Sequence, residues 1–445
     1  MVELESTYGV PTVGIYLRVF EALVNATVRM NGMPRPRQAF LPGPLVNVPA
    51  AGLRRQIEGE DPVHGRPVMS VVLDALTRAL SPEELRGVGY GRSLPRLVET
   101  DTEESLQRQF GAHGWTDHLP IVLPTEERVA NMLQGTSHAP DEVVGRLRPT
   151  IGGWELREFD VEKVAVNAVM AGAGPEHLPV LLALASSGDH ARNASATSMA
   201  KMVVVNGPIR SELGMNAGVG ALGPFNRANS VIGRAYGLLS QNLGGGSVPG
   251  VSYGGSQGNN LLYNNATFAE NEEESPFAPF HARHGYRRDE STVTIFWAWG
   301  YWWAENLRAH WEEKLVAMLC GMEPTLGATF VLDPIVAREF VDRGIRSPEQ
   351  LSAWVHEKAR IPARRYWDHV STVAVRSLVE AGVEPYASYR QADPDALIPV
   401  FEPERVEVVV VGGSTNGSWF LFQGAPRRAS ADTTRRSTIS VDAWR

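Results

Sequence analysis

The residues best suited to chemistry lie in the middle of this 445-residue chain, where asparagines, arginines and glycines are closely spaced. A short apolar run at 203–205 leads into Asn206-Gly207-Pro208, and further asparagines and glycines follow. Glycine lets the backbone approach a ligand, and asparagine and arginine side chains supply hydrogen-bond donors. We expect a small polar or anionic molecule here, with a helix that begins at about residue 229 adding oriented N–H groups. The expected binding side chains are Asn206, Arg210, Asn216, Asn226, Asn229 and Arg234.

A second segment with similar potential follows the four valines Val408 to Val411, which are typical of a buried parallel strand. Ligands of α/β proteins bind beyond the carboxyl ends of such strands. Gly412, Gly413, Ser414 and Thr415 follow directly, and we expect them to contribute backbone and hydroxyl donors to the substrate site. The motif is neither a Walker loop nor a dinucleotide fingerprint, and an ordinary strand and turn would explain it equally well.

Candidate acid–base residues follow the central segment. Glu270 begins the acidic run 270–274, and His281 lies in the pattern His281-x-x-His284. A buried glutamate and a histidine are suited to proton transfer, so Glu270 and His281 are the expected catalytic pair. A solvated turn and surface histidines are the alternative interpretation. A metal site needs about three converging ligands, so we expect no metal, and the sequence identifies no cofactor.

Composition limits the class of protein. The formal net charge is −8, which argues against nucleic acid or an anionic membrane as the main partner. Cys320 is the one cysteine, which excludes an internal disulfide, and its position before Gly321 predicts a structural role at a helix end. The longest apolar stretch, 293–303, is too short to span a bilayer, and no signal peptide is visible. The sequence thus predicts a cytoplasmic protein.

The positions of glycines, prolines and helix-capping residues along the chain predict an α/β fold in three parts. Residues 1–100 open with a strand at 10–17 and a helix at about 18–31, so we expect a partial α/β domain that a partner chain completes. A short N-terminal helix on a complete domain is the alternative. Residues 101–423 are expected to form the main α/β substrate-binding domain, and residues 424–445 a loose tail. No internal repeat is visible in the sequence.

Several stretches of the sequence resemble the UGSC-type (seleno)protein family, and together they cover most of residues 8–300. The resemblance is carried by 8–13, 42–45, 61–68, 119–129, 163–172, 175–176, 205–209, 229–235, 269–272 and 275–276. Members of that family carry a Cys- or Sec-Gly-Ser-Cys motif in an N-terminal α/β region. That motif is absent here and would lie before Met1, and Ala173 stands where relatives have a cysteine.

The resemblance implies the large subunit of a heteromeric bacterial enzyme, with thiol or selenol chemistry supplied by a small partner subunit. Such an enzyme would be a thiol-dependent oxidoreductase or a lyase. Two other hypotheses remain open. One is a thiol-independent lyase or hydrolase that uses Glu270, His281 and His284, with or without a metal. The other is a non-catalytic binding subunit.

Overall fold

The computed structural model describes residues 4–5, 8–30, 33, 35–43, 45, 48–85, 96–147, 157–189, 191, 200–244, 257–426 and 437–445. Helices and mixed sheets alternate along it, so the chain has the expected α/β class. None of the helices in this part of the chain is both long and apolar enough to cross a membrane.

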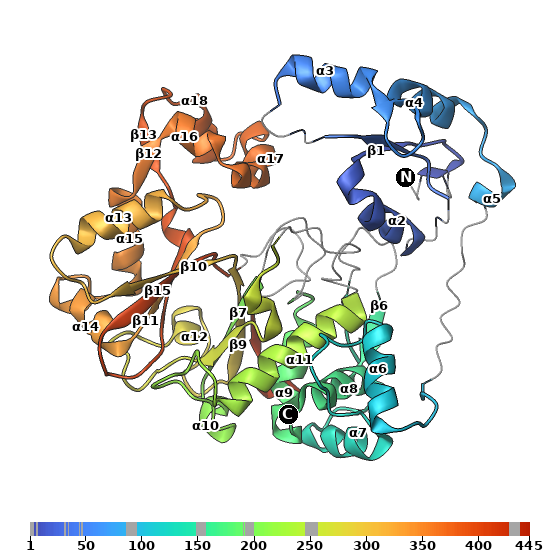
Figure 1. The fold of residues 1–445 in the computed structure, drawn as a ribbon. Helices are drawn as coiled ribbons and strands as arrows, with labels where there is room; N and C mark the ends of the chain where they lie inside the picture. Colours follow the sequence, from blue (N-terminus) through green and yellow to red (C-terminus); the bar gives the residue numbers. More distant parts are fainter. Residues whose placement is uncertain are drawn as a thin grey trace.

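The N-terminal unit is a small α/β lobe of its own (Figure 1). Its two strands, β1 (Gly14–Leu17) and β2 (Gln38–Leu41), are parallel. Buried residues of β2 pack against α4, whose buried face includes Val68 and Val72. The other elements are α2 (Glu21–Met30), α3 (Ala50–Glu58), β3 (Glu60–Asp61), β4 (Arg66–Pro67), α4 (Val68–Thr77) and α5 (Pro82–Leu85).

A helical layer follows along the chain. Its helices begin at N-caps that local sequence predicts: the Thr125 hydroxyl accepts from the amide of Arg128, and the Asp160 carboxylate accepts from the amide of Lys163. Helix α8 ends at Gly172, whose φ of 83° suits glycine. The elements are α6 (Glu103–Ala112), α7 (Glu126–Met132), β5 (Val143–Leu147), β6 (Arg157–Asp160), α8 (Val161–Ala171), α9 (Leu178–Ser186) and, later in the chain, α11 (Arg227–Gly244).

Two four-stranded mixed sheets form the centre of the main domain. The first has the order β16 (Thr438–Ser440), β9 (Thr292–Ala298), β7 (Ala200–Asn206) and β8 (Ala266–Ala269). The second has the order β10 (Tyr301–Glu305), β15 (Ser418–Gln423), β11 (Ala328–Leu332) and β14 (Val406–Val410). Strand β14 is parallel to β11 and fully buried, as the run of valines predicted.

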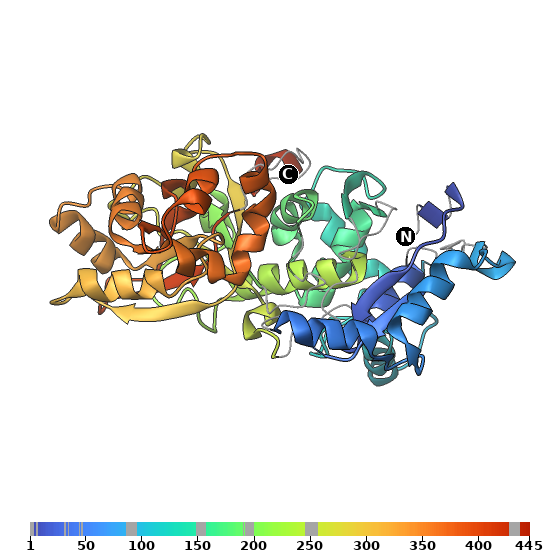
Figure 2. The ribbon, with the colours of Figure 1, turned by 90° about the horizontal axis from the view of Figure 1, so that it is seen from above.

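The two sheets pack against each other between two layers of helices. Alternate residues of β7 divide between the faces: Met202 and Val204 contact the second sheet, and Val203 and Val205 contact the helices α8, α9 and α11. On the far side, the second sheet packs against α13 (Trp311–Cys320), α14 (Pro334–Asp342) and α15 (Pro348–Lys358). Figures 1 and 2 show these helices on the outside of the sheets. The shorter elements are α10 (Ile209–Glu212), α12 (Phe280–Arg283), β12 (Arg360–Pro362), α16 (Ala363–Asp368), α17 (Arg376–Glu380), α18 (Tyr386–Gln391) and β13 (Leu397–Pro399).

The two sheets share one topology, although no repeat is visible in the sequence. In each, a central strand has a parallel neighbour on one side and an antiparallel neighbour on the other. Strand β7 lies between β8 and β9 in this way, and β11 lies between β14 and β15. The registers make Asn206 equivalent to Asp333, and Glu270 equivalent to Val411.

The edge strands are exchanged between the sheets. Strand β10 follows β9 along the chain but pairs with β15, and β16 follows β15 but pairs with β9. Where the two connections cross, the amide of Trp297 donates to the carbonyl of Ala425 at 3.2 Å, and that of Trp299 donates to Gln423 at 3.0 Å. Gly424 lies at the centre of the crossing. The half of the main domain that contains the first sheet and the half that contains the second are related by an approximate twofold relation.

The prediction of a loose tail at 424–445 is wrong for residues 437–445. Strand β16 pairs with β9, Val441 is buried in the core of the helical layer, and Trp444 packs against the same core. The hydroxyl of Thr136 also donates to the carbonyl of Trp444 at 2.8 Å. A polar, arginine-rich composition suggested disorder, but an edge position in a sheet needs few apolar residues. Residues 427–436 lie outside the described residues.

We expect Gly424→Ala to destabilise the fold strongly, because the crossing leaves no room for a side chain. Gly424 has a φ of 140°, and a Cβ there would lie 2.2 Å from the carbonyl oxygen of Trp297. A loss of about 2–4 kcal/mol in the free energy of unfolding is expected from urea titration. Gly300→Ala is the matched control, because a Cβ at Gly300 meets nothing within 4 Å. Equal stability of the two variants would contradict the proposed tight crossing.

Candidate functional site

The two glycine-rich segments that the sequence singled out lie against each other. The amide of Gly412 donates to the carbonyl of Ala217 at 2.8 Å, and Gly413 packs on Val219. Between them is a pocket of about 260 Å³, here called the glycine-turn pocket. It is lined by residues 219–223, Val331, Asp333, 411–413, Thr415, Asn416, Ser418 and Phe420. Three of the predicted residues, Gly412, Gly413 and Thr415, therefore line one pocket.

Asp333 is the charged side chain that lines the glycine-turn pocket. It directly follows β11 and is the N-cap of α14, where its Oδ1 accepts from the amide of Val336 at 2.8 Å. Its Oδ2 accepts from the amide of Ser418. The carboxylate is buried, and each oxygen keeps a second lone pair. The pocket thus lies at the carboxyl ends of parallel strands and offers a fixed acceptor to a ligand.

Three of the four predicted asparagines of the central segment shape the wall of this pocket. The Nδ2 of Asn226 donates to the carbonyls of Gly220 at 2.7 Å and Gly223 at 2.9 Å. The Nδ2 of Asn229 donates to the carbonyl of Ala221 at 3.1 Å, and that of Asn216 donates to Asn226 Oδ1 at 2.8 Å. These side chains hold the loop at 219–223 in shape. The structure therefore gives them a role different from the ligand contacts that we expected.

Arg234 and Ser414 also have protein partners. The guanidinium of Arg234 forms two hydrogen bonds with the Asp117 carboxylate, at 2.9 and 3.0 Å, so it joins α11 to the segment before α7. The hydroxyl of Ser414 donates to Glu274 Oε2 at 2.6 Å and accepts from Arg338 at 2.7 Å. Arg338 on α14 and Glu274 hold the turn in place, and no local motif marked Arg338 in the sequence.

The other predicted residues gather at the carboxyl ends of β7 and β8. The Nδ2 of Asn206 donates to Glu270 Oε2 at 2.5 Å and to Glu272 Oε1 at 3.0 Å. Arg210 contacts Glu272 at 3.1 Å and donates to the carbonyl of Glu270 at 2.7 Å. His281 Nδ1 lies 4.0 Å from Glu272 Oε1. We call Asn206, Arg210, Glu270, Glu272 and His281 the carboxylate cluster.

Burial dominates the proton chemistry of the carboxylate cluster. It raises the pKa of Glu270 to about 7, although hydrogen bonds from the Phe280 amide and from Asn206 favour the ionised form. Burial also lowers the pKa of His281, and the nearby Glu272 carboxylate opposes that shift. Glu270 therefore changes its protonation state near neutral pH, as a general acid or base must.

Two buried oxygens, one in the carboxylate cluster and one next to it, have unused hydrogen-bonding capacity. Asn206 Oδ1 and Thr292 Oγ1 make no hydrogen bond to any described residue, and these two residues face each other across β7 and β9. Buried polar atoms of this kind commonly mark the place of a water or a ligand. Thr292 lies in an apolar strand, so the sequence gave no signal for it. No three His, Cys, Asp or Glu side chains of the described residues are placed to hold a metal.

The carboxylate cluster and the glycine-turn pocket occupy equivalent places in the two halves. Asn206 and Glu270 of the first correspond to Asp333 and Val411 of the second. Asn271 links them directly, because its amide donates to the carbonyl of Val410 and its Nδ2 donates to that of Gly412, both at 2.8 Å. Through Asn271, the titratable Glu270 is therefore connected to the backbone that lines the glycine-turn pocket.

Two further candidates lie elsewhere. Cys320 ends α13 in the outer helical layer, where burial raises the pKa of its thiol. A raised thiol pKa disfavours the reactive thiolate, which agrees with the structural role expected of Cys320. The ring of His284 lies against that of Phe280 at an interplanar angle of 32°, and its Nε2 lies 3.4 Å from Glu407 Oε2, on the side of the second sheet.

Comparisons with protein-family models, with curated protein sequences and with solved structures gave no match to this chain.

We expect Glu270→Gln to change how stability depends on pH. A carboxyl whose pKa rises from 4.5 to about 7 on folding contributes stability that is full below pH 4.5 and is lost as pH passes 7. The unfolding free energy of the wild type relative to the variant should therefore fall by up to about 3 kcal/mol between pH 5 and pH 8.

Urea unfolding at several pH values measures this difference. Glu104→Gln is the control, because that side chain is 85% exposed and its replacement should give a nearly constant difference. A constant difference for Glu270→Gln as well would mean that Glu270 stays ionised throughout.

Proposed function

We propose that this chain is the substrate-binding large subunit of a heteromeric enzyme, and that its glycine-turn pocket binds a small polar or carboxylated molecule. The observation that carries the proposal is the convergence of two glycine-rich segments, far apart in the sequence, at the carboxyl ends of β11 and β14. The amides of Gly220 and Gly413 donate no hydrogen bond to a described residue, so they are available to ligand oxygens. The Asp333 carboxylate would accept from a hydroxyl or ammonium group of the same ligand.

Glu270 is the acid–base group of this proposal. Its pKa of about 7 makes both protonation states accessible near neutral pH, and Asn271 connects it to the pocket backbone. The same observation favours a second candidate function, a thiol-independent lyase or hydrolase in which Glu270 and His281 move the proton. The two candidates differ in whether a thiol outside this chain is needed.

Two observations support a partner chain. Strand β1 pairs with β2 alone among the described strands, and Ile15 on it is 51% exposed, whereas parallel sheets are normally larger and covered on both faces. The one cysteine lies in the outer helical layer, so thiol chemistry at the pocket would need a group from elsewhere. The resemblance to the UGSC-type family supports a small subunit that provides both a strand and a thiol.

The pocket is tested by thermal shift with a panel of small hydroxy acids, amino acids and polyols at millimolar concentration. A panel member that raises the wild-type melting temperature should bind Thr415→Trp at least tenfold more weakly, because the indole would block the pocket. Thr77→Trp, at an exposed position of α4, is the control and should bind normally. A ligand that stabilises both variants equally binds elsewhere, and the pocket would then lose its proposed role.

The partner is tested by thiol titration of the protein purified from its natural host under mild conditions. In a Cys320→Ser variant this chain has no thiol, so any thiol that reacts with 5,5′-dithiobis(2-nitrobenzoate) belongs to a bound partner. About one or more partner thiols or selenols per chain are expected, and Ile15→Arg should remove them by disrupting the edge of β1. A thiol-free, monodisperse protein would contradict the heteromeric proposal and favour the thiol-independent one.

A further inference from the structure

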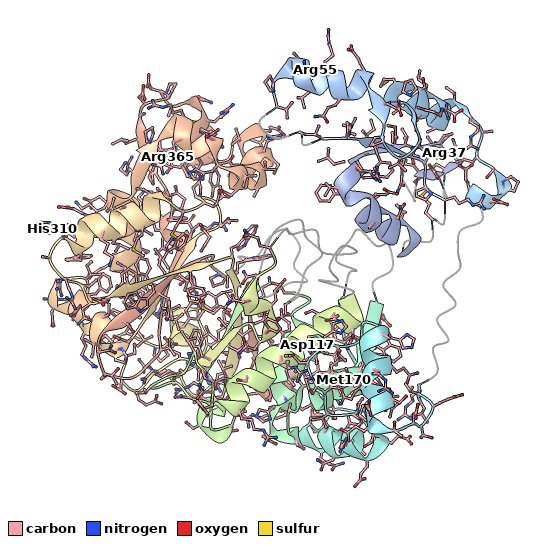
Figure 3. All side chains as sticks on the ribbon, in the orientation of Figure 1. Arg37, Arg55, Asp117, Met170, His310 and Arg365 are labelled. Carbon is pink, nitrogen blue, oxygen red and sulfur yellow. The ribbon has the colours of Figure 1, made fainter. Side chains whose placement is uncertain are left out.

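A second and larger pocket lies in the helical layer, away from the residues that the sequence indicated for catalysis or substrate binding. It has a volume of about 530 Å³ and lies among α6, α8 and α11. Figure 3 labels Met170, which lines it from α8. We call it the helical pocket. Its apolar lining consists of Leu97, Val98, Leu106, Phe110, Trp115, Leu123, Pro124, Val166 and Met170.

The aromatic wall of the helical pocket is fixed in place. The rings of Phe110 and Trp115 meet edge to face with centroids 5.2 Å apart, and both belong to or pack against the main core. Helix α8 supplies Val166 and Met170 from consecutive turns. A preformed pocket of this size, with mostly apolar walls, is typical of sites for organic ligands.

The side-chain amide of Asn242 can orient a ligand in the helical pocket. The Nδ2 of Asn242 donates to the carbonyl of Trp115 at 3.0 Å and to Asn167 Oδ1 at 2.7 Å, so the amide orientation is fixed. Its Oδ1 is buried and accepts no hydrogen bond from the described residues. Asn167 Nδ2 donates one of its two N–H groups to the carbonyl of Lys163 at 2.9 Å. Asn242 Oδ1 is therefore an acceptor that suits one N–H or O–H donor.

The charges at the rim disfavour an anion. Arg96 lines the pocket, but its guanidinium contacts Glu162 at 2.7 Å and Glu126 at 3.2 Å. Glu99 lies in the same lining segment. The acidic groups outnumber Arg96, so a carboxylate or sulfonate entering here would meet a negative field.

We propose that the helical pocket is a second ligand site, which takes a neutral aromatic molecule with one hydrogen-bond donor directed at Asn242 Oδ1. The site is separate from the glycine-turn pocket. Asn242 lies near the end of α11, whereas the loop that walls the glycine-turn pocket precedes the start of that helix. The 18 residues of α11 span roughly 27 Å, so one ligand cannot reach both pockets.

The probe for the experiment is N-phenyl-1-naphthylamine, a neutral fluorescent molecule with a single N–H. Its emission should rise on binding the full-length wild type and saturate at one equivalent. Val166→Trp should fill the pocket and weaken binding at least tenfold, with Leu106→Trp as a second filling variant in case the first does not fold. Val370→Trp is the control, because that position is 71% exposed, and it should bind like the wild type.

Two analogues test the donor and the charge. 1-Benzylnaphthalene has CH₂ in place of the N–H and should compete about fivefold to tenfold more weakly, the effect of one hydrogen bond. Asn242→Leu should remove this preference. 1-Anilinonaphthalene-8-sulfonate should bind more weakly than the neutral amine. Non-saturable binding, wild-type affinity in both folded filling variants, no preference for the amine over the benzyl analogue, or a preference for the sulfonate would each overturn the proposal.

Discussion

The constraint on which this structure depends is the dry layer between its two sheets. Strands β7, β8 and β9 present Val204, Phe268 and Phe296 to that layer, and β11, β14 and β15 present residues such as Val331 and Phe422 from the other side. The opposite faces of the same strands are covered by helices, so apolar side chains predominate within the strands, although a few buried polar side chains such as Thr267, Thr294 and Thr329 also lie there. The carboxylate cluster and the glycine-turn pocket lie at strand ends, where a buried polar group finds hydrogen-bond partners more easily.

Because the two halves are related by an approximate twofold relation, the carboxylate cluster and the glycine-turn pocket can be compared position by position. At one, Asn206 and Glu270 fill the space with polar side chains, and Arg210 compensates the neighbouring Glu272. At the other, Asp333 remains, but valine and glycines take the equivalent places, so a pocket is left. Side-chain volume thus separates a filled, titratable site from one with room for a ligand. The contact of Asn271 with Gly412 joins them.

The sequence predicted the parts of this structure that local chemistry determines. The valines at 408–411 were expected to form a buried parallel strand, and they mark the end of β14 and the residue after it. Asn206 was expected as a binding residue and Glu270 as a catalytic one, and the structure brings their side chains together at the ends of β7 and β8. The exchange of β10 and β16, the loop-shaping role of Asn226, and the helical pocket were not predictable, because each depends on pairing between distant segments. A loose tail was predicted from composition alone, and sheet register overrode it for residues 437–445.

The exchanged edge strands also determine the order in which the two sheets can be completed during synthesis of the chain. The first sheet receives β16 only after the whole second half has emerged from the ribosome, because residues 438–440 follow β15 along the chain. Until then the outer edge of β9 is bare, and the helical layer lacks the buried Val441. The second sheet has the opposite history, since its borrowed strand β10 is synthesised before the rest of that sheet. The two halves therefore close as one unit, and neither is a separable module that could be cut out, moved or inherited without the other.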